Sequence, residues 1–179
     1  MANQVQKLAY VDAKLGVSLP GQQTTRTLFD TNTATLGQTY FEFFKNFAGK
    51  TALETNLTTN RLDSAESMVI KSIFLNTENT GAVYADHALL NIFVGNQNVI
   101  KDMDISYNSE PLGLSFDRLH SAVASDRRVE IRLLTDIVIP PQVNFYATLQ
   151  LSNTALTAGQ KLLCEFRGYG KLFSAGNSF

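Results

Sequence analysis

The sequence predicts an all-β protein, an antiparallel β-sandwich of about eight strands. Apolar and polar residues alternate along several segments, short turn-forming clusters separate these segments, and helical periodicity is rare. The 179 residues suit one compact domain. We expect a single jelly roll, in which two facing sheets have Greek-key connections. An immunoglobulin-like sandwich is the alternative, although its Cys–Trp–Cys pattern is missing because the chain has one Cys and no Trp.

The first 38 residues predict an extended N-terminal arm. They are rich in Gln, Thr, Asn and Ala, and their apolar residues are scattered rather than periodic. Such a segment gains little free energy by folding on itself, but it gains by lying across a partner subunit. We therefore divide the chain into an arm at 1–38 and a jelly-roll domain at 39–179.

Residues 40–47 hold the densest aromatic cluster of the chain. Helical spacing groups Tyr40 with Phe44, whereas strand spacing groups Phe41 with Phe43, so periodicity leaves both structures open. Aromatic residues are enriched in strands, and this favours a strand here.

The strand signals are clearer from residue 67 onward. In 143–151, five apolar residues face one way and polar residues face the other. In the last segment, Gly168 and Gly170 are expected to permit a bulge or the close approach of another strand. The expected strands lie at 67–75, 88–94, 99–105, 128–133, 143–151 and 161–173.

One stretch, at about 115–124, predicts a short helical insertion between strands. Ser115 is a suitable N-cap, and Phe116, Leu119 and Val123 follow at i, i+3 and i+7. The turn signal before it supports a helix that begins near residue 115.

Residues that carry chemistry are scarce. The two histidines, His87 and His120, fall in a turn and at a helix edge, where histidine is usually structural or solvated. Cys164 lies on the apolar face of its strand and is expected to act as a small hydrophobe. Asp102 and Asp104 lack the glycine and glutamate of a calcium loop. We therefore expect no catalytic residue, metal ion, cofactor or small-molecule substrate.

The charge balance excludes a strong general attraction to nucleic acid or to anionic membranes. The net charge is -1, from 16 acidic and 15 basic residues. No apolar run at the N-terminus has signal-peptide length, so we expect a protein made in the cytoplasm. Glu130 lies within the most basic local group, which favours a charge ladder. The candidate nucleic-acid contacts in this group are Arg127, Arg128 and Arg132.

Three segments carry a resemblance to a known class of proteins. The runs NRLDSAESMVIKSI at 60–73, LNIFVGNQNVI at 90–100 and IPPQVNF at 139–145 resemble jelly-roll coat proteins of tailless icosahedral bacteriophages. The likeness covers residues 57–173 in the style and order of elements. It implies a capsid subunit in a homo-oligomeric icosahedral shell, with an arm that reaches neighbours and possible contacts to other virion proteins. It also implies a virion location after assembly in the host cytoplasm, and no catalytic residues.

The functional expectation is therefore a self-assembling structural subunit of a phage capsid. The alternative is a receptor- or carbohydrate-binding β-sandwich module, such as a virion spike or minor vertex protein, and an enzyme has the least support. Scattered apolar anchors suit docking on a neighbour, while the aromatic cluster can instead fill the chain's own core. The candidate interface residues are Val5, Leu8, Tyr10, Leu28, Phe29, Tyr40 and Phe44.

Overall fold

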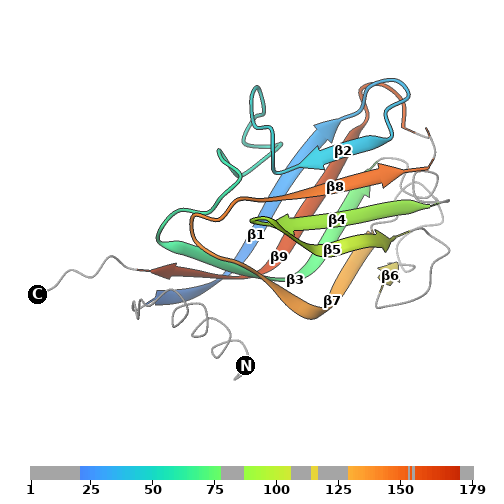
Figure 1. Ribbon diagram of the computed structural model, residues 1–179. Coiled ribbons are helices and arrows are strands. Elements are labelled where there is room, and N and C mark those ends of the chain that lie inside the picture. Colours follow the sequence, from blue (N-terminus) through green and yellow to red (C-terminus); the bar gives the residue numbers. More distant parts are fainter. Residues whose placement is uncertain are drawn as a thin grey trace, which may run out of the picture.

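Strands in two antiparallel sheets make up the protein (Figure 1). The computed structural model describes residues 21–77, 87–105, 114–116, 129–152, 154 and 156–173. Within this part of the chain there are nine strands and no helix. The strands are β1 (Gly21–Thr33), β2 (Tyr40–Phe43), β3 (Glu66–Thr77), β4 (Ala88–Val94), β5 (Gln97–Asp104), β6 (Leu114–Phe116), β7 (Val129–Ile139), β8 (Phe145–Leu151) and β9 (Lys161–Phe173).

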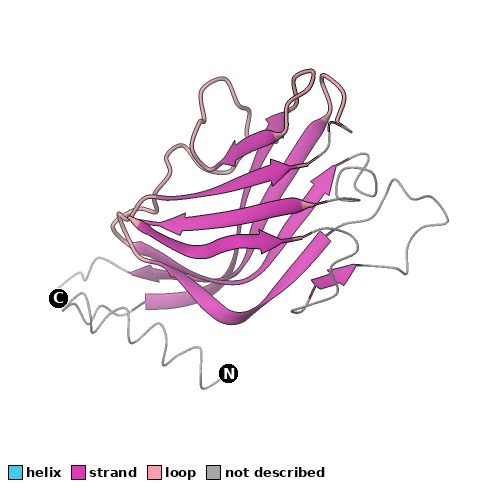
Figure 2. Cartoon of the chain, turned by 45° about the vertical axis from the view of Figure 1, so that its right-hand side comes forward, coloured by secondary structure: helices cyan, strands magenta, loops and turns pink. Residues whose placement is uncertain are grey.

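The strands pair in a nested order. One sheet has the order β1-β9-β3-β7-β6, and the other has the order β2-β8-β4-β5. Four antiparallel pairs enclose one another along the chain: β1 with β9, β2 with β8, β3 with β7, and β4 with β5. Successive pairs alternate between the two sheets, and Figure 2 shows the sheets as separate layers.

Apolar side chains from both sheets form one core. In β8 the buried positions include Phe145, Ala147, Leu149 and Leu151, which is the face that the alternation at 143–151 predicts. Phe145 belongs to a cluster of aromatic rings, whose centroids lie 4.6–6.5 Å apart; its members are Phe44, Phe145 and Phe166. The all-β fold with two antiparallel sheets is thus confirmed, and its arrangement is sandwich-like.

Most expected strands are confirmed at or near their expected bounds. The segments 88–94 and 161–173 coincide with β4 and β9, and 67–75 lies within β3. Residues 40–43 form a strand, which resolves the helical alternative there. The strand expected at 128–133 is longer in the structure, because β7 continues to Ile139.

Part of the expected arm belongs to the sheet. Residues 21–33 form β1, which pairs with β9 along its whole length, from Gly21 opposite Phe173 to Thr33 opposite Lys161. The threonine-rich sequence hides this strand because only one face needs to be apolar, and there Leu28 is fully buried. Of the remainder of the arm, residues 34–38 are described and Ala34 is buried in the core, whereas 1–20 lie outside the described residues.

The prediction of a helix at 115–124 is wrong for its first two residues. Ser115 and Phe116 are in β6, where they pair with Glu130 and Val129 of β7. Pairing with a neighbouring strand overrides the local N-cap and helical spacing. The rest of that segment, 117–124, lies outside the described residues.

Gly168 permits a close approach between β9 and β3. A Cβ atom there would lie 1.9 Å from the carbonyl oxygen of Val69, next to a shift in register between Ile70 and Ser72. At Gly170 the nearest atom would be in the flexible side chain of Arg26, 2.9 Å away. The expected close approach of another strand is therefore confirmed at Gly168, where the backbone of β3 leaves no room for a Cβ atom.

Candidate functional site

The strongest candidate for a binding site is an open cleft at one end of the four-stranded sheet. Three connections meet there: the end of the β2–β3 connection, the β4–β5 turn and the β7–β8 connection, at the left of the sheet in Figure 1. The cleft has a volume of about 600 Å³. Polar residues outnumber apolar ones in its lining, which comprises Lys45, Asn60, Arg61, Phe93, Gly95, Asn96, Gln142, Asn144 and Tyr146.

Backbone hydrogen bonds between the three connections fix the walls of this cleft. The N–H of Gly95 donates to the carbonyl of Asn144 at 2.7 Å, and the N–H of Phe145 donates to the carbonyl of Asn60 at 2.8 Å. The N–H of Gln142 donates to the carbonyl of Leu62 at 3.0 Å. These bonds position the side chains of the cleft on a shared backbone frame rather than on independent loops.

Two aromatic residues line the cleft, and their rings stack on each other. Phe93 of β4 is directly opposite Tyr146 of β8 in the sheet, and their rings stack with centroids 4.5 Å apart and an angle of 10°. Lys45 continues the row, because its Nζ lies 5.3 Å from the centre of the Tyr146 ring. Cross-strand stacking and a cation–π contact hold these three side chains in order.

The two cations of the cleft differ in how they are paired. Lys45 Nζ donates to Glu42 Oε1 at 2.6 Å, and this hydrogen bond holds the pKa of Lys45 above its ordinary value. Arg61 is exposed, and its guanidinium has no hydrogen bond or ion pair with the described residues. One positive charge of the cleft is therefore compensated and the other is available.

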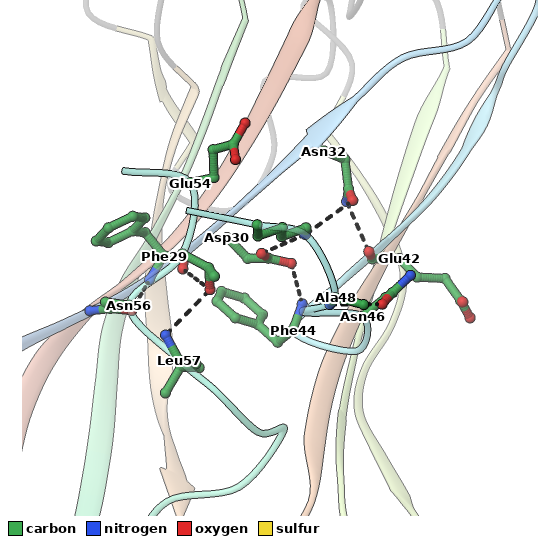
Figure 3. Close-up of polar contacts among 12 residues, drawn as sticks. Phe29, Asp30, Asn32, Glu42, Phe44, Asn46, Ala48, Glu54, Asn56 and Leu57 are labelled. Atoms are coloured by element: carbon green, nitrogen blue, oxygen red, sulfur yellow. Dashed lines mark hydrogen bonds and ion pairs between the residues drawn. The ribbon is translucent and has the colours of Figure 1, made fainter. Parts of the chain in front are cut away.

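A buried ion pair anchors the loop that leads into this cleft (Figure 3). The carboxylate of Asp30 is fully buried in β1. Its Oδ1 accepts a hydrogen bond from Lys50 Nζ at 2.6 Å, and its Oδ2 accepts one from the N–H of Phe44 at 2.7 Å. Phe44 has a φ of 60°, so this carboxylate holds a backbone conformation that non-glycine residues rarely adopt.

Further hydrogen bonds attach the same loop to the outer edge of β1. Asn56 Nδ2 donates to the carbonyl of Thr27 at 2.7 Å. Asn56 Oδ1 accepts from the N–H of Phe29 at 3.0 Å (Figure 3). The N–H of Thr31 donates to the carbonyl of Glu54 at 2.8 Å. The loop thereby satisfies part of an edge that would otherwise present unpaired backbone groups.

The predicted interface residues lie in different environments. Phe44 is fully buried in the chain's own core, which is the alternative that the sequence left open for the aromatic cluster. Leu28, expected as an anchor of the arm on a neighbour, is also fully buried in this core, because β1 is a strand of the sheet. Phe29 is half-buried, and Tyr40 is 47% exposed at the start of β2. Outside the described residues lie the other three candidates, Val5, Leu8 and Tyr10.

Of the arginines considered as nucleic-acid contacts, the structure describes Arg132. Its side chain is 71% exposed, and its Nε lies 3.5 Å from Glu130 Oε1 on the same strand. This contact agrees with a charge ladder along β7. Arg127 and Arg128 lie outside the described residues.

Cys164 is buried in β9, and burial raises the pKa of its thiol well above the usual range. It is therefore a core residue, as its place on an apolar strand face predicts. His87 lies 3.1 Å through Nδ1 from Asp104 Oδ2, at an exposed position.

The described residues contain no group of three or more His, Cys, Asp or Glu side chains that could hold a metal ion. Across the same residues, no helix is long and apolar enough to cross a membrane. No protein-family model, curated protein or solved structure matches this chain. The strand order, the cleft and the exposed side chains are therefore the features of this chain that bear on its function.

Proposed function

We propose that this protein is a single jelly roll that serves as a structural subunit of a viral capsid. The observation that carries the proposal is the nested pairing of eight strands, β1–β9, β2–β8, β3–β7 and β4–β5. A jelly roll arises when a long antiparallel ribbon of four such pairs rolls up, so that successive pairs fall in opposite sheets. This topology is typical of viral coat domains and lectin domains. In this reading the short β6 is an addition beside β7.

Two exposed leucines on opposite sides of the five-stranded sheet, one in the β2–β3 connection and one on β7, support self-association. Leu53 is 91% exposed and lies next to Glu54, which bonds to the outer edge of β1. Leu134 is 82% exposed on β7, at the other side of the same sheet. Contact between the β1 side of one copy and the β7 side of the next would bury both. Such a head-to-tail contact generates a ring when the rotation between successive copies closes, and rings can combine into a shell.

A capsid subunit has particular partners and a particular location. Copies of this chain are the main partners, other virion proteins are further partners, and the assembled protein resides in the virion after assembly in the host cytoplasm. The genome is not expected to be condensed by this chain, since its net charge is -1.

The native mass of the purified protein tests the proposal. We expect light scattering after size exclusion to detect pentamers, trimers or larger species, and electron micrographs to show rings or shells. Leu53→Glu and Leu134→Glu should each weaken association about tenfold or more, because each places a charge in an apolar contact. Ser64→Glu, a matched change at another exposed position, should leave association unchanged. A 19.7 kDa monomer at every concentration would overturn the proposal.

A further inference from the structure

We propose that the cleft between the β2–β3, β4–β5 and β7–β8 connections binds an acidic saccharide, with Arg61 pairing with its carboxylate. The inference goes beyond assembly and does not rest on it. A glycan-binding cleft fits a virion protein that attaches to a host surface, and it equally fits a free binding module.

The charge of the cleft indicates a ligand that presents a negatively charged group to Arg61. Lys45 is paired with Glu42, with 2.6 Å between Nζ and Oε1, so its charge is largely compensated within the protein. Arg61 has no such partner among the described residues and is exposed to an incoming group. A guanidinium binds a carboxylate through two parallel hydrogen bonds, a geometry that an ammonium does not offer.

The polar lining indicates hydroxyl groups on the rest of the ligand. Four residues with amide side chains line the cleft from the three connections, and the Nε2 of one of them, Gln142, also donates to the carbonyl of Leu62 at 3.3 Å. The four are Asn60, Asn96, Gln142 and Asn144. A sugar hydroxyl also donates and accepts, so amides can satisfy neighbouring hydroxyls in both directions. Within the described residues there is no helix, so no helix N-terminus is available there to bind a phosphate.

The aromatic pair supplies the apolar part of the site. Phe93 and Tyr146 line the cleft and are held rigid by their mutual stacking at 4.5 Å. The C–H face of a pyranose ring is apolar and gains free energy when it covers such aromatic carbon. The cleft volume of about 600 Å³ falls within the usual size range of small-ligand sites.

Saturation-transfer NMR and calorimetric titration of the whole protein test this inference. The probes are sialyllactose and trigalacturonate as acidic saccharides, lactose and maltotriose as their neutral counterparts, and inorganic phosphate as a simple anion. We expect the acidic saccharides to bind with a dissociation constant of about 1 mM or lower. The neutral counterparts should bind at least tenfold more weakly, because the charge-assisted hydrogen bonds are missing.

A matched pair of variants locates the site. Arg61→Gln should weaken acidic-saccharide binding at least tenfold, whereas Lys101→Gln removes the same charge from an exposed position on β5 outside the cleft and should have no effect. Thermal unfolding of both variants verifies that they are folded. Binding and assembly are separate readouts, so the inference can fail while the capsid proposal stands, and the reverse also holds.

Four results would overturn the inference. They are no binding at 10-fold the expected dissociation constant, equal binding of neutral and acidic saccharides, displacement of the saccharide by phosphate at equal concentration, and equal losses in the two variants. Equal losses would indicate a general charge effect, and displacement by phosphate would indicate a nonspecific anion site.

Discussion

The connection between β2 and β3, residues 44–65, has two halves that use polar residues in opposite ways. In the first half, Phe44 and Lys50 meet the buried carboxylate of Asp30, and each polar atom of that contact is paired. In the second half, Asn60 and Arg61 face an open cleft, and the charge of Arg61 has no partner among the described residues. Buried and paired groups hold the loop in place, whereas exposed groups with unused bonding capacity are available to a ligand.

Replacement of Asp30 should produce the largest change. Asp30→Ala leaves the N–H of Phe44 without an acceptor and Lys50 without its ion-pair partner, so the free energy of unfolding should fall by about 3 kcal/mol. Urea denaturation measures the loss. Asp63→Ala, at an exposed position of the same connection, is the control and should change stability by less than about 0.5 kcal/mol. A loss below about 1 kcal/mol in Asp30→Ala would show that the ion pair does not anchor the loop.

Lowering the pH should also destabilise the protein through the first half of the β2–β3 connection, by less than Asp30→Ala does. Hydrogen bonds from Lys161 and Thr51 lower the pKa of Glu54 from 4.5 to about 2. A lowered folded-state pKa means that the stabilisation is present above pH 4.5 and is lost as the pH falls toward 2. The free energy of unfolding should therefore fall between pH 4.5 and pH 2, and it should fall less steeply in Glu54→Gln. Urea midpoints measured at several pH values, for both proteins, give the difference; parallel curves would contradict the expectation.

Replacement of Arg61 should have the smallest effect on stability. Its side chain is exposed and unpaired among the described residues, so Arg61→Gln should change the free energy of unfolding by less than about 0.5 kcal/mol. The same urea denaturation measures it. A loss as large as that of Asp30→Ala would show that Arg61 holds the loop and would remove the contrast between the two halves.

The fold was predictable where one strand face is apolar and the other polar. The alternation at 143–151 and 88–94 identifies β8 and β4 because burial of one sheet face imposes a period of two. The strand β1 was less visible, since it contains many Thr and Gln residues and forms by pairing with β9 far along the chain. At Ser115 and Phe116 the local sequence predicted a helix, but these residues pair with β7 and form a strand.

The cleft was not predictable in the same way. Asn60, Asn96 and Asn144 come from three connections that only the wrapping of the strands brings together. A partial signal was present in Tyr146, which the alternation of β8 places on the outer face. The burial of Asp30 had no local signal either, because its partner Lys50 lies 20 residues further along the chain.

The nested pairing also sets an order for folding during synthesis. The hairpin of β4 and β5 requires only a two-residue turn, whereas β1 must wait for β9, the last of the described strands to leave the ribosome. Because β9 lies between β1 and β3, β1 has no partner strand in its sheet until that moment, and β3 has only β7. Long-range pairing of this kind is slow and leaves strand edges exposed in the meantime. We therefore expect chains that stop before β9 to be prone to aggregation.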